Sequence, residues 1–235
     1  ASWLMILGYE PNANAAKKQD ECLRGDISLD VPRGARIGIK SKDGDLSVEN
    51  VAKITIKNIN GDVNLRDIAN ETEVTSLSSD ISIENANGKI AAKTVSGDVE
   101  VYRCRPIEIS DSCKISSTSG SVSMQETAHR NIEATSTSGD VSIYGALSNG
   151  GSYDFSTTSG AIALFLPANS SFQLNATMSY GASFNSEIPL KTSTQNSTQK
   201  VQQTESRQIK ATCGAGDSNI NLTTFNGSLR IKKTK

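Results

Sequence analysis

Apolar residues stand in pairs along most of the chain, with one polar residue between the two members of each pair. Seven pairs follow a short Gly-Asp-like motif by two and four residues. They are Leu46/Val48, Val63/Leu65, Ile81/Ile83, Val99/Val101, Val122/Met124, Val141/Ile143 and Ile162/Leu164. Successive side chains of a strand point to opposite faces, so this period of two predicts short strands with one buried face.

A second set of apolar pairs precedes the motif by seven and five residues, or continues the same alternation near the C-terminus. It comprises Ile37/Ile39, Ile54/Ile56, Ile90/Ala92, Cys113/Ile115, Ile132/Ala134, Tyr153/Phe155, Leu174/Ala176, Ile209/Ala211 and Ile220/Leu222. Each repeat is therefore predicted to hold two strands joined by a turn. A glycine at the motif supplies the positive φ of a tight turn, and a neighbouring Asp, Asn or Ser can bond the turn backbone.

The motif recurs at positions 44, 61, 79, 97, 120, 139 and 160, at intervals of 17 to 23 residues, with serine in place of glycine at 79. A two-strand unit of this size cannot bury its own apolar face, so neighbouring units must stack. We expect an all-β, single-domain β-solenoid, a right-handed β-helix of about nine coils, with aliphatic residues inside and Ser/Thr ladders outside. A β-sandwich is the alternative, but its strands need not keep such a constant register.

The regular pattern is interrupted at several places, which set the expected domain organisation. Residues 1–25 form an N-terminal segment or capping strand, with the apolar run Trp3–Leu7 as a terminal strand or a leftover. Residues 26–235 form the solenoid. Pro167 ends the regular run because proline cannot donate to a ladder. Residues 191–208 are a polar insertion, predicted to be a loop or exposed hairpin, and the basic C-terminal tail is expected to cap an end coil.

Composition narrows the function classes. The chain has 33 Ser and 19 Thr among 235 residues, 5% aromatic residues and a formal net charge of −1. A near-neutral chain lacks the electrostatic signature of a nucleic-acid-binding protein, and no apolar run is long enough to be a transmembrane segment. These values favour a neutral, polar-faced rod without a charged groove.

The cysteines and the single histidine offer little catalytic or metal chemistry. Cys104 and Cys113 could form a disulfide across a loop, or remain free thiols, whereas nothing local supports a Cys22–Cys213 pair. No CxxC pair is present, which argues against a zinc site. His129 lies in a polar, turn-like stretch and is expected at the surface.

Four sequence markers suggest a family. They are Val31-Pro32-Arg33-Gly34-Ala35, the repeated Ser-Gly-Asp-Val, Leu166-Pro167 followed by Ser171–Ala176 and Pro189-Leu190, and the closing segment 220–227. Together, over about residues 26–232, they resemble a bacterial family of adhesin-like β-strand-repeat envelope proteins, a domain of unknown function. The resemblance implies a β-helix-like fold, an extracytoplasmic setting and a role in adhesion or envelope sensing. It supplies no catalytic or ligand-binding residues.

Two further chemistries deserve a test. Asp45, Asp62, Asp80, Asp98 and Asp140 share one register position, so stacking could line up carboxylates for calcium, although capping of the turn backbone is the simpler interpretation. A second possibility is a carbohydrate-active β-helix enzyme that uses Arg103, Arg105, Glu108 and Asp111.

We therefore expect a non-catalytic, extracytoplasmic module of the cell envelope or surface that binds a protein or a glycan as an adhesin, scaffold or sensor. Catalytic, cofactor-binding and metal-binding residues are not expected, nor is a nucleic-acid partner. The alternatives are the β-helix enzyme and a structural domain of a larger membrane-anchored envelope regulator. The oligomeric state is left open by the sequence.

Overall fold

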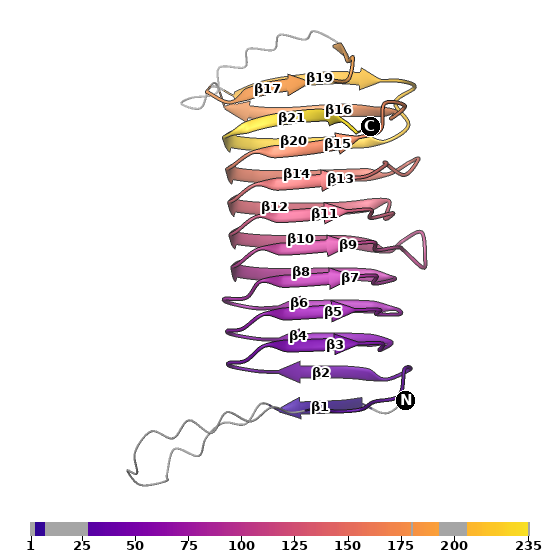
Figure 1. The fold of residues 1–235 in the computed structure, drawn as a ribbon. Coiled ribbons are helices and arrows are strands. Elements are labelled where there is room, and N and C mark those ends of the chain that lie inside the picture. The colour runs from indigo at the N-terminus through magenta and orange to yellow at the C-terminus, as the bar shows by residue number, and fades with distance from the viewer. Residues whose placement is uncertain (1–2, 8–27, 180, 193–205, 235) are drawn as a thin grey trace, which may run out of the picture.

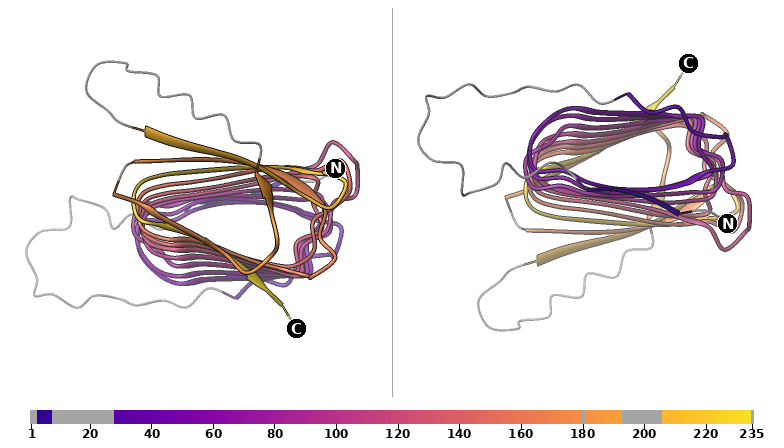
Figure 2. Two further views of the ribbon diagram at one scale, coloured as in Figure 1. Left: turned by 90° about the horizontal axis from the view of Figure 1, so that it is seen from above. Right: turned by 90° about the horizontal axis from the view of Figure 1, so that it is seen from below.

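The computed structural model describes residues 3–7, 28–179, 181–192 and 206–234. These residues form strands and no helix, and the strands stack into two sheets that face each other (Figure 1). Viewed along the stacking axis, successive coils superimpose on a flattened ring (Figure 2). The expected β-solenoid is confirmed, because neighbouring coils pair parallel and in register, which is not the arrangement of a β-sandwich.

The larger sheet, sheet A, has twelve strands among the described residues. In spatial order they are β1 (Trp3–Leu7), β2 (Arg36–Lys40), β4 (Lys53–Lys57), β6 (Glu71–Thr75), β8 (Lys89–Ser96), β10 (Ser112–Ser119), β12 (Asn131–Ser138), β14 (Ser152–Ser159), β20 (Asn219–Asn226), β16 (Phe172–Ser179), β19 (Ser206–Cys213) and β18 (Lys191–Thr192).

The smaller sheet, sheet B, has nine strands in the part of the chain that the structure describes. In spatial order they are β17 (Ser183–Ser186), β21 (Ser228–Lys233), β15 (Ile162–Leu166), β13 (Val141–Tyr144), β11 (Val122–Gln125), β9 (Val99–Tyr102), β7 (Ile81–Glu84), β5 (Val63–Arg66) and β3 (Leu46–Glu49).

The core lies between the sheets and consists of stacked aliphatic side chains. The residues two positions after the repeat motif from 61 onward, and after the closing Gly227, show the arrangement in sheet B, where they are register partners and buried. They are Val63, Ile81, Val99, Val122, Val141, Ile162 and Leu229. Each such side chain contributes about 1.5–3 kcal/mol of burial free energy, so repetition compensates for the low aromatic content.

A ladder of polar side chains is also buried, three residues before the motif positions from 61 to 160 and before the closing Gly227. Its members are Asn58, Ser76, Thr94, Ser117, Ser136, Thr157 and Thr224. Ser136 Oγ donates to Gly120 O at 2.8 Å, and Thr157 Oγ1 donates to Gly139 O at 2.9 Å. The expectation that the Ser/Thr ladders lie outside holds for the ladder beside the glycine turn, since Thr118, Thr137 and Thr158 are exposed. It fails one residue earlier, where the glycine carbonyl of the neighbouring coil needs a buried donor.

The glycine turns stack directly on one another. A Cβ added to Gly120 would lie 2.1 Å from Gly97 O, and a Cβ on Gly139 would lie 2.1 Å from Gly120 O. Gly97 also has a φ of 127°, in the region that favours glycine. The repeated glycine therefore answers two demands, a positive φ at several turns and a backbone approach that leaves no room for a side chain.

The last strands of the sequence are not at the end of the rod. β20 lies between β14 and β16, and β21 lies between β15 and β17 (Figure 1). The expected capping by the basic tail is therefore wrong. The final coil brings four buried apolar residues, Ile220, Leu222, Leu229 and Ile231, and stacking on both sides buries more of their surface than an end position would.

Antiparallel strands close this end of sheet A instead. β19 pairs antiparallel with β16, and the two residues of β18 pair antiparallel with β19. The polar insertion predicted at 191–208 therefore has paired strands at both its ends, and residues 193–205 lie outside the described residues. At the other end of sheet A, Trp3–Leu7 forms the expected terminal strand, parallel to β2.

The cysteines of the described chain are free and buried. Cys104, Cys113 and Cys213 form no disulfide, whereas Cys22 lies outside the described residues. Cys104 Sγ donates to Tyr102 O at 3.4 Å. Burial raises the pKa of Cys104 to about 11 and also raises the pKa of Cys113. Of the two interpretations left open for Cys104 and Cys113, the structure has the free thiols, and burial keeps them protonated and unreactive at neutral pH.

Candidate functional site

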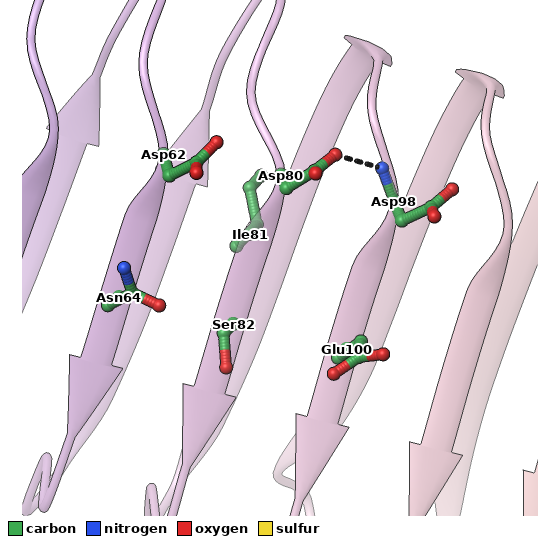
Figure 3. Close-up of a pocket in the computed structure, with 7 residues that line it drawn as sticks. All are labelled: Asp62, Asn64, Asp80, Ile81, Ser82, Asp98 and Glu100. Carbon is green, nitrogen blue, oxygen red and sulfur yellow. Dashed lines mark hydrogen bonds between the residues drawn. The ribbon is translucent and has the colours of Figure 1, made fainter.

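The outer face of β5, β7 and β9 carries a shallow depression lined by carboxylates (Figure 3). Its side chains come from two positions of the repeat, the residue before each strand and the residue two places further on. They are Asp62, Asp80 and Asp98, then Asn64, Ser82 and Glu100, with Ile81 beneath. The depression has a volume of about 260 Å³. It is smaller than a typical small-molecule pocket of roughly 300–1,000 Å³ and opens on a flat sheet.

The aspartates of this register cap the backbone. Asp80 Oδ1 accepts the N–H of Asp98 at 2.8 Å (Figure 3), and Asp98 Oδ1 accepts the N–H of Ser121 at 2.7 Å. Asp45 and Asp140 accept equivalent N–H groups at 2.9 and 2.7 Å. Backbone capping is confirmed for Asp45, Asp80, Asp98 and Asp140, with the difference that each of these carboxylates caps the turn of the next coil. Among the described residues, no group of three or more His, Cys, Asp or Glu side chains could hold a metal ion.

Substitution of Asp98 tests this capping role. We expect Asp98→Ala to lower the free energy of unfolding by about 1–2 kcal/mol, because the Ser121 N–H loses its charged acceptor. Asp98→Asn keeps an acceptor oxygen and should lose less than half as much. Urea titrations measure both variants. Melting temperatures with calcium and with chelator should agree for the unsubstituted chain, and a rise with calcium would contradict capping as the only role.

A second row of charged side chains, a charged ladder, runs along the other edge of the outer face of sheet B. Arg66 lies between Glu49 and Glu84, with nitrogen–oxygen distances of 3.6 and 3.0 Å, and Arg103 approaches Glu84 at 3.3 Å. These pairs are exposed, and each contributes at most about 1 kcal/mol to stability. Their alternation of sign fixes the orientation of the side chains on the surface.

The same ladder becomes aromatic at Tyr102 and continues through Gln125, Tyr144 and Phe165 to Lys232. The Tyr144 and Phe165 rings stack at 4.1 Å with an angle of 7° between their planes. Arg103 covers the Tyr102 ring at 4.3 Å, and Lys232 lies 5.4 Å from the Phe165 ring centre. Protein groups therefore occupy ring faces that a sugar would need for stacking, which favours a packing role for these aromatic residues.

The loop between β9 and β10 holds the residues considered for carbohydrate catalysis, and it projects from the rod (Figure 1). Asp111 Oδ2 accepts the N–H groups of Ile107 and Glu108 at 2.9 and 2.8 Å, so its carboxylate holds the loop backbone. Arg103 pairs with Glu84 on sheet B. Arg103 and Asp111 thus have separate structural partners, and Arg105 and Glu108 are exposed.

His129 is buried, so its expected surface position is wrong. The ring has no exposed surface, and Nε2 donates to Gly88 O at 2.7 Å. Nδ1 has no hydrogen-bond partner among the residues that the structure describes. The polar stretch around His129 follows β11 and folds against the β9–β10 loop, where the imidazole supplies the donor for a buried carbonyl. Burial lowers the pKa of His129, and the Gly88 carbonyl and Asp111 partly oppose that shift.

Acidification should therefore destabilise the protein through His129. The imidazole stabilises the fold in its neutral form, so its contribution is complete above the unfolded-state pKa of about 6.5 and decreases as the pH falls through the lower folded-state pKa. We expect His129→Gln to have a smaller loss of stability between about pH 6.5 and 5 than the unsubstituted chain. His129 is the only histidine, so the difference between the two urea-denaturation series isolates its effect. Identical pH profiles would contradict the assignment.

The outer face of sheet A is basic in the four coils that also contain β3, β5, β7 and β9. Strands β2, β4, β6 and β8 place three outward ladders side by side. The charged members are Arg36, Lys40, Lys53, Lys57, Lys89 and Lys93, with Glu71 and Glu73. Only Lys53 and Glu71 form an ion pair in this group, at 2.5 Å. The expected neutral rod is therefore wrong: net neutrality conceals a basic face and an acidic face.

Comparison with known proteins identifies the family. The model of a family described as Toastrack DUF4097 matches residues 21–126 and 103–232. The two matches overlap and together cover most of the chain, which therefore belongs to this family, a domain of unknown function. No curated protein and no solved structure matches the chain. In the described part of the chain, no helix is long and apolar enough to cross a membrane.

Proposed function

We propose that this member of the Toastrack family is a non-catalytic module of the cell envelope or cell surface, which binds a protein or a glycan as an adhesin, scaffold or sensor. The observation that carries the proposal is the flat outer face of sheet B. Its polar side chains repeat along the coils around a shallow depression, where Asp80 and Asp98 are engaged with backbone N–H groups. Such a rigid, extended surface suits a large partner better than a small enclosed substrate.

Binding measurements with a substitution on this face test the proposal. Asp62 and Glu100 are exposed, and within the described ranges neither carboxylate has an ion pair or an accepted hydrogen bond, so Asp62→Lys/Glu100→Lys should preserve the fold. We expect the chain to bind one component of a panel of envelope proteins and surface glycans, and the double variant to bind it at least about tenfold more weakly. Arg207→Glu/Lys210→Glu on β19 is the control, which should bind normally. Equal binding by both double variants would show that the partner does not bind to this face.

An extracytoplasmic location is part of the proposal. It is supported by the resemblance of the repeated Ser-Gly-Asp-Val segments to envelope proteins. Added protease should cleave an epitope-tagged form of the natural gene product in intact cells, or in cells with a permeabilised outer layer, while a cytoplasmic marker stays intact. Protection until complete lysis would contradict this location.

A carbohydrate-active enzyme is the second candidate, because Asp62, Asp80, Asp98 and Glu100 line one depression. Strands in a sheet are about 4.8 Å apart, a spacing compatible with a pair of glycosidase carboxylates. The backbone bonds of Asp80 and Asp98 favour a structural role. Release of reducing ends from polysaccharides would decide between the two. We expect none, and activity that disappears in Glu100→Gln would establish the enzyme.

A further inference from the structure

We propose that the acidic outer face of sheet B is a docking surface for a second copy of this chain, which presents the basic outer face of its sheet A. This is the same face that is proposed above to bind a partner, and the inference rests on the proposed function only for that choice of face. It is carried by the charge of the two faces and by the spacing of their charges.

The acidic face belongs to strands β3, β5, β7 and β9, together with the residue before each strand. The outward charged side chains at these positions are Asp45, Glu49, Asp62, Asp80, Glu84, Asp98, Glu100 and the cation Arg66. Arg103, the residue after β9, adds a second cation at the edge of the face, where it pairs with Glu84. The seven carboxylates and the Arg66 guanidinium give these strand positions a net charge of −6. The carboxylates are exposed or half-buried, so they are available to a partner.

The basic face belongs to β2, β4, β6 and β8, the strands that complete the same four coils. Six cations and two carboxylates point outward there, a net charge of +4. Lys57 and Lys93 are exposed and have no ion pair with any described residue, and each belongs to the ladder that begins at Lys40. The two faces lie on opposite sides of the rod, so one copy can contact two neighbours (Figure 2).

The repeat spacing favours a second copy over other charged partners. Both faces place their charges at intervals of one coil, about 4.8 Å, because strand separation within a sheet sets the interval. Two identical rods share this interval, so the cations of β2, β4 and β8 stay in step with carboxylates of the partner, while β6 contributes Glu71 and Glu73 and no cation. A polymer with a different repeat would lose the match within a few charges.

Docking a basic face on an acidic face is a head-to-tail contact between different surfaces. Contacts of this kind close into a ring only when the rotation between copies allows it, and otherwise continue as an open row. The structure therefore predicts side-by-side assemblies that grow with protein concentration. Salt should dissociate them, since about 0.15 M salt screens exposed charges beyond roughly 8 Å.

Sedimentation velocity on the full chain tests the proposal. At about 20 mM NaCl we expect concentration-dependent association, at least about tenfold weaker at about 300 mM NaCl. Lys57→Glu/Lys93→Glu reduces the basic face to a net charge of zero, and Asp62→Lys/Glu100→Lys reduces the acidic face to −2. Each variant alone should associate at least tenfold more weakly than the unsubstituted chain.

Mixing the two variants gives the decisive result. One variant retains an intact acidic face and the other retains an intact basic face, so the mixture should form a complex that stops at one copy of each. Arg207→Glu/Lys210→Glu, with the same charge change on β19, should associate like the unsubstituted chain.

A monomer under all conditions, or association that neither double variant weakens, would overturn the proposal. Association that mixing fails to restore would also overturn it. Binding of heparin, used as a polyanion probe, by a chain that stays monomeric at low salt would assign the basic face to polyanions instead. None of these outcomes affects the test of the proposed function, which is carried out at dilutions where the chain is monomeric.

Discussion

Replacement of Gly120 by alanine is expected to lower the free energy of unfolding by about 3 kcal/mol or more. The new Cβ would lie 2.1 Å from Gly97 O, and backbone atoms of two coils would have to separate to accommodate it. The hydroxyl of Ser136 donates to Gly120 O, so movement at Gly120 would also disturb a buried hydrogen bond. Urea denaturation followed by circular dichroism measures the loss.

Two other glycines separate the causes of this loss. Gly44 has a φ of 117° but nothing within 4 Å of an added Cβ, so Gly44→Ala should cost only the backbone strain, about 1–2 kcal/mol. Gly38 lies in β2 with open space and without a positive φ, so Gly38→Ala should change stability by less than about 1 kcal/mol. Equal losses at Gly44 and Gly120 would show that close approach between coils does not contribute.

Much of the architecture can be predicted from the sequence because the repeat carries it directly. Pairs such as Val63/Leu65 and Ile81/Ile83 are buried and in register, as their alternation predicts. The recurrence of the glycine motif also predicts the turn between the strands. Every coil repeats the same sequence pattern, so a strand that is hard to assign in one repeat can be assigned from the equivalent positions of the neighbouring repeats.

The features that sequence reasoning missed depend on contacts between coils. Ser136 and Thr157 look like surface residues in a single repeat, and only the glycine carbonyl of the neighbouring coil explains their burial. Their constant position three residues before the motif was the available signal. His129 is buried for a related reason, since its partner Gly88 is 41 residues earlier in the chain.

The two charged faces could have been found from the sequence by sorting charges by strand. Lys53 and Lys57 occupy outward positions of one strand in the repeat, whereas Asp62 stands beside the following strand. Net charge averages over this separation and hides it. Assigning each charge to the first or the second strand of its repeat reveals the basic and acidic faces.

The position of the final coil leads to the second large prediction. Leu229→Asp is expected to lower the free energy of unfolding by about 4 kcal/mol or more, although residue 229 is close to the end of the sequence. Leu229 is fully buried and stands in register between Ile162 of β15 and Phe184 of β17. A carboxylate there would be desolvated between two coils, without a donor in the aliphatic ladder.

Phe184→Asp is the matched control for this prediction, because β17 is the last strand of sheet B and Phe184 is only half-buried. A carboxylate at that position can reach solvent, so the expected loss is below about 2 kcal/mol. Urea denaturation compares the two variants directly. If the final coil were a terminal cap, the order would reverse, with Leu229→Asp tolerated and Phe184→Asp strongly destabilising. The larger loss at Leu229 would establish in solution that the last coil of the sequence lies inside the rod.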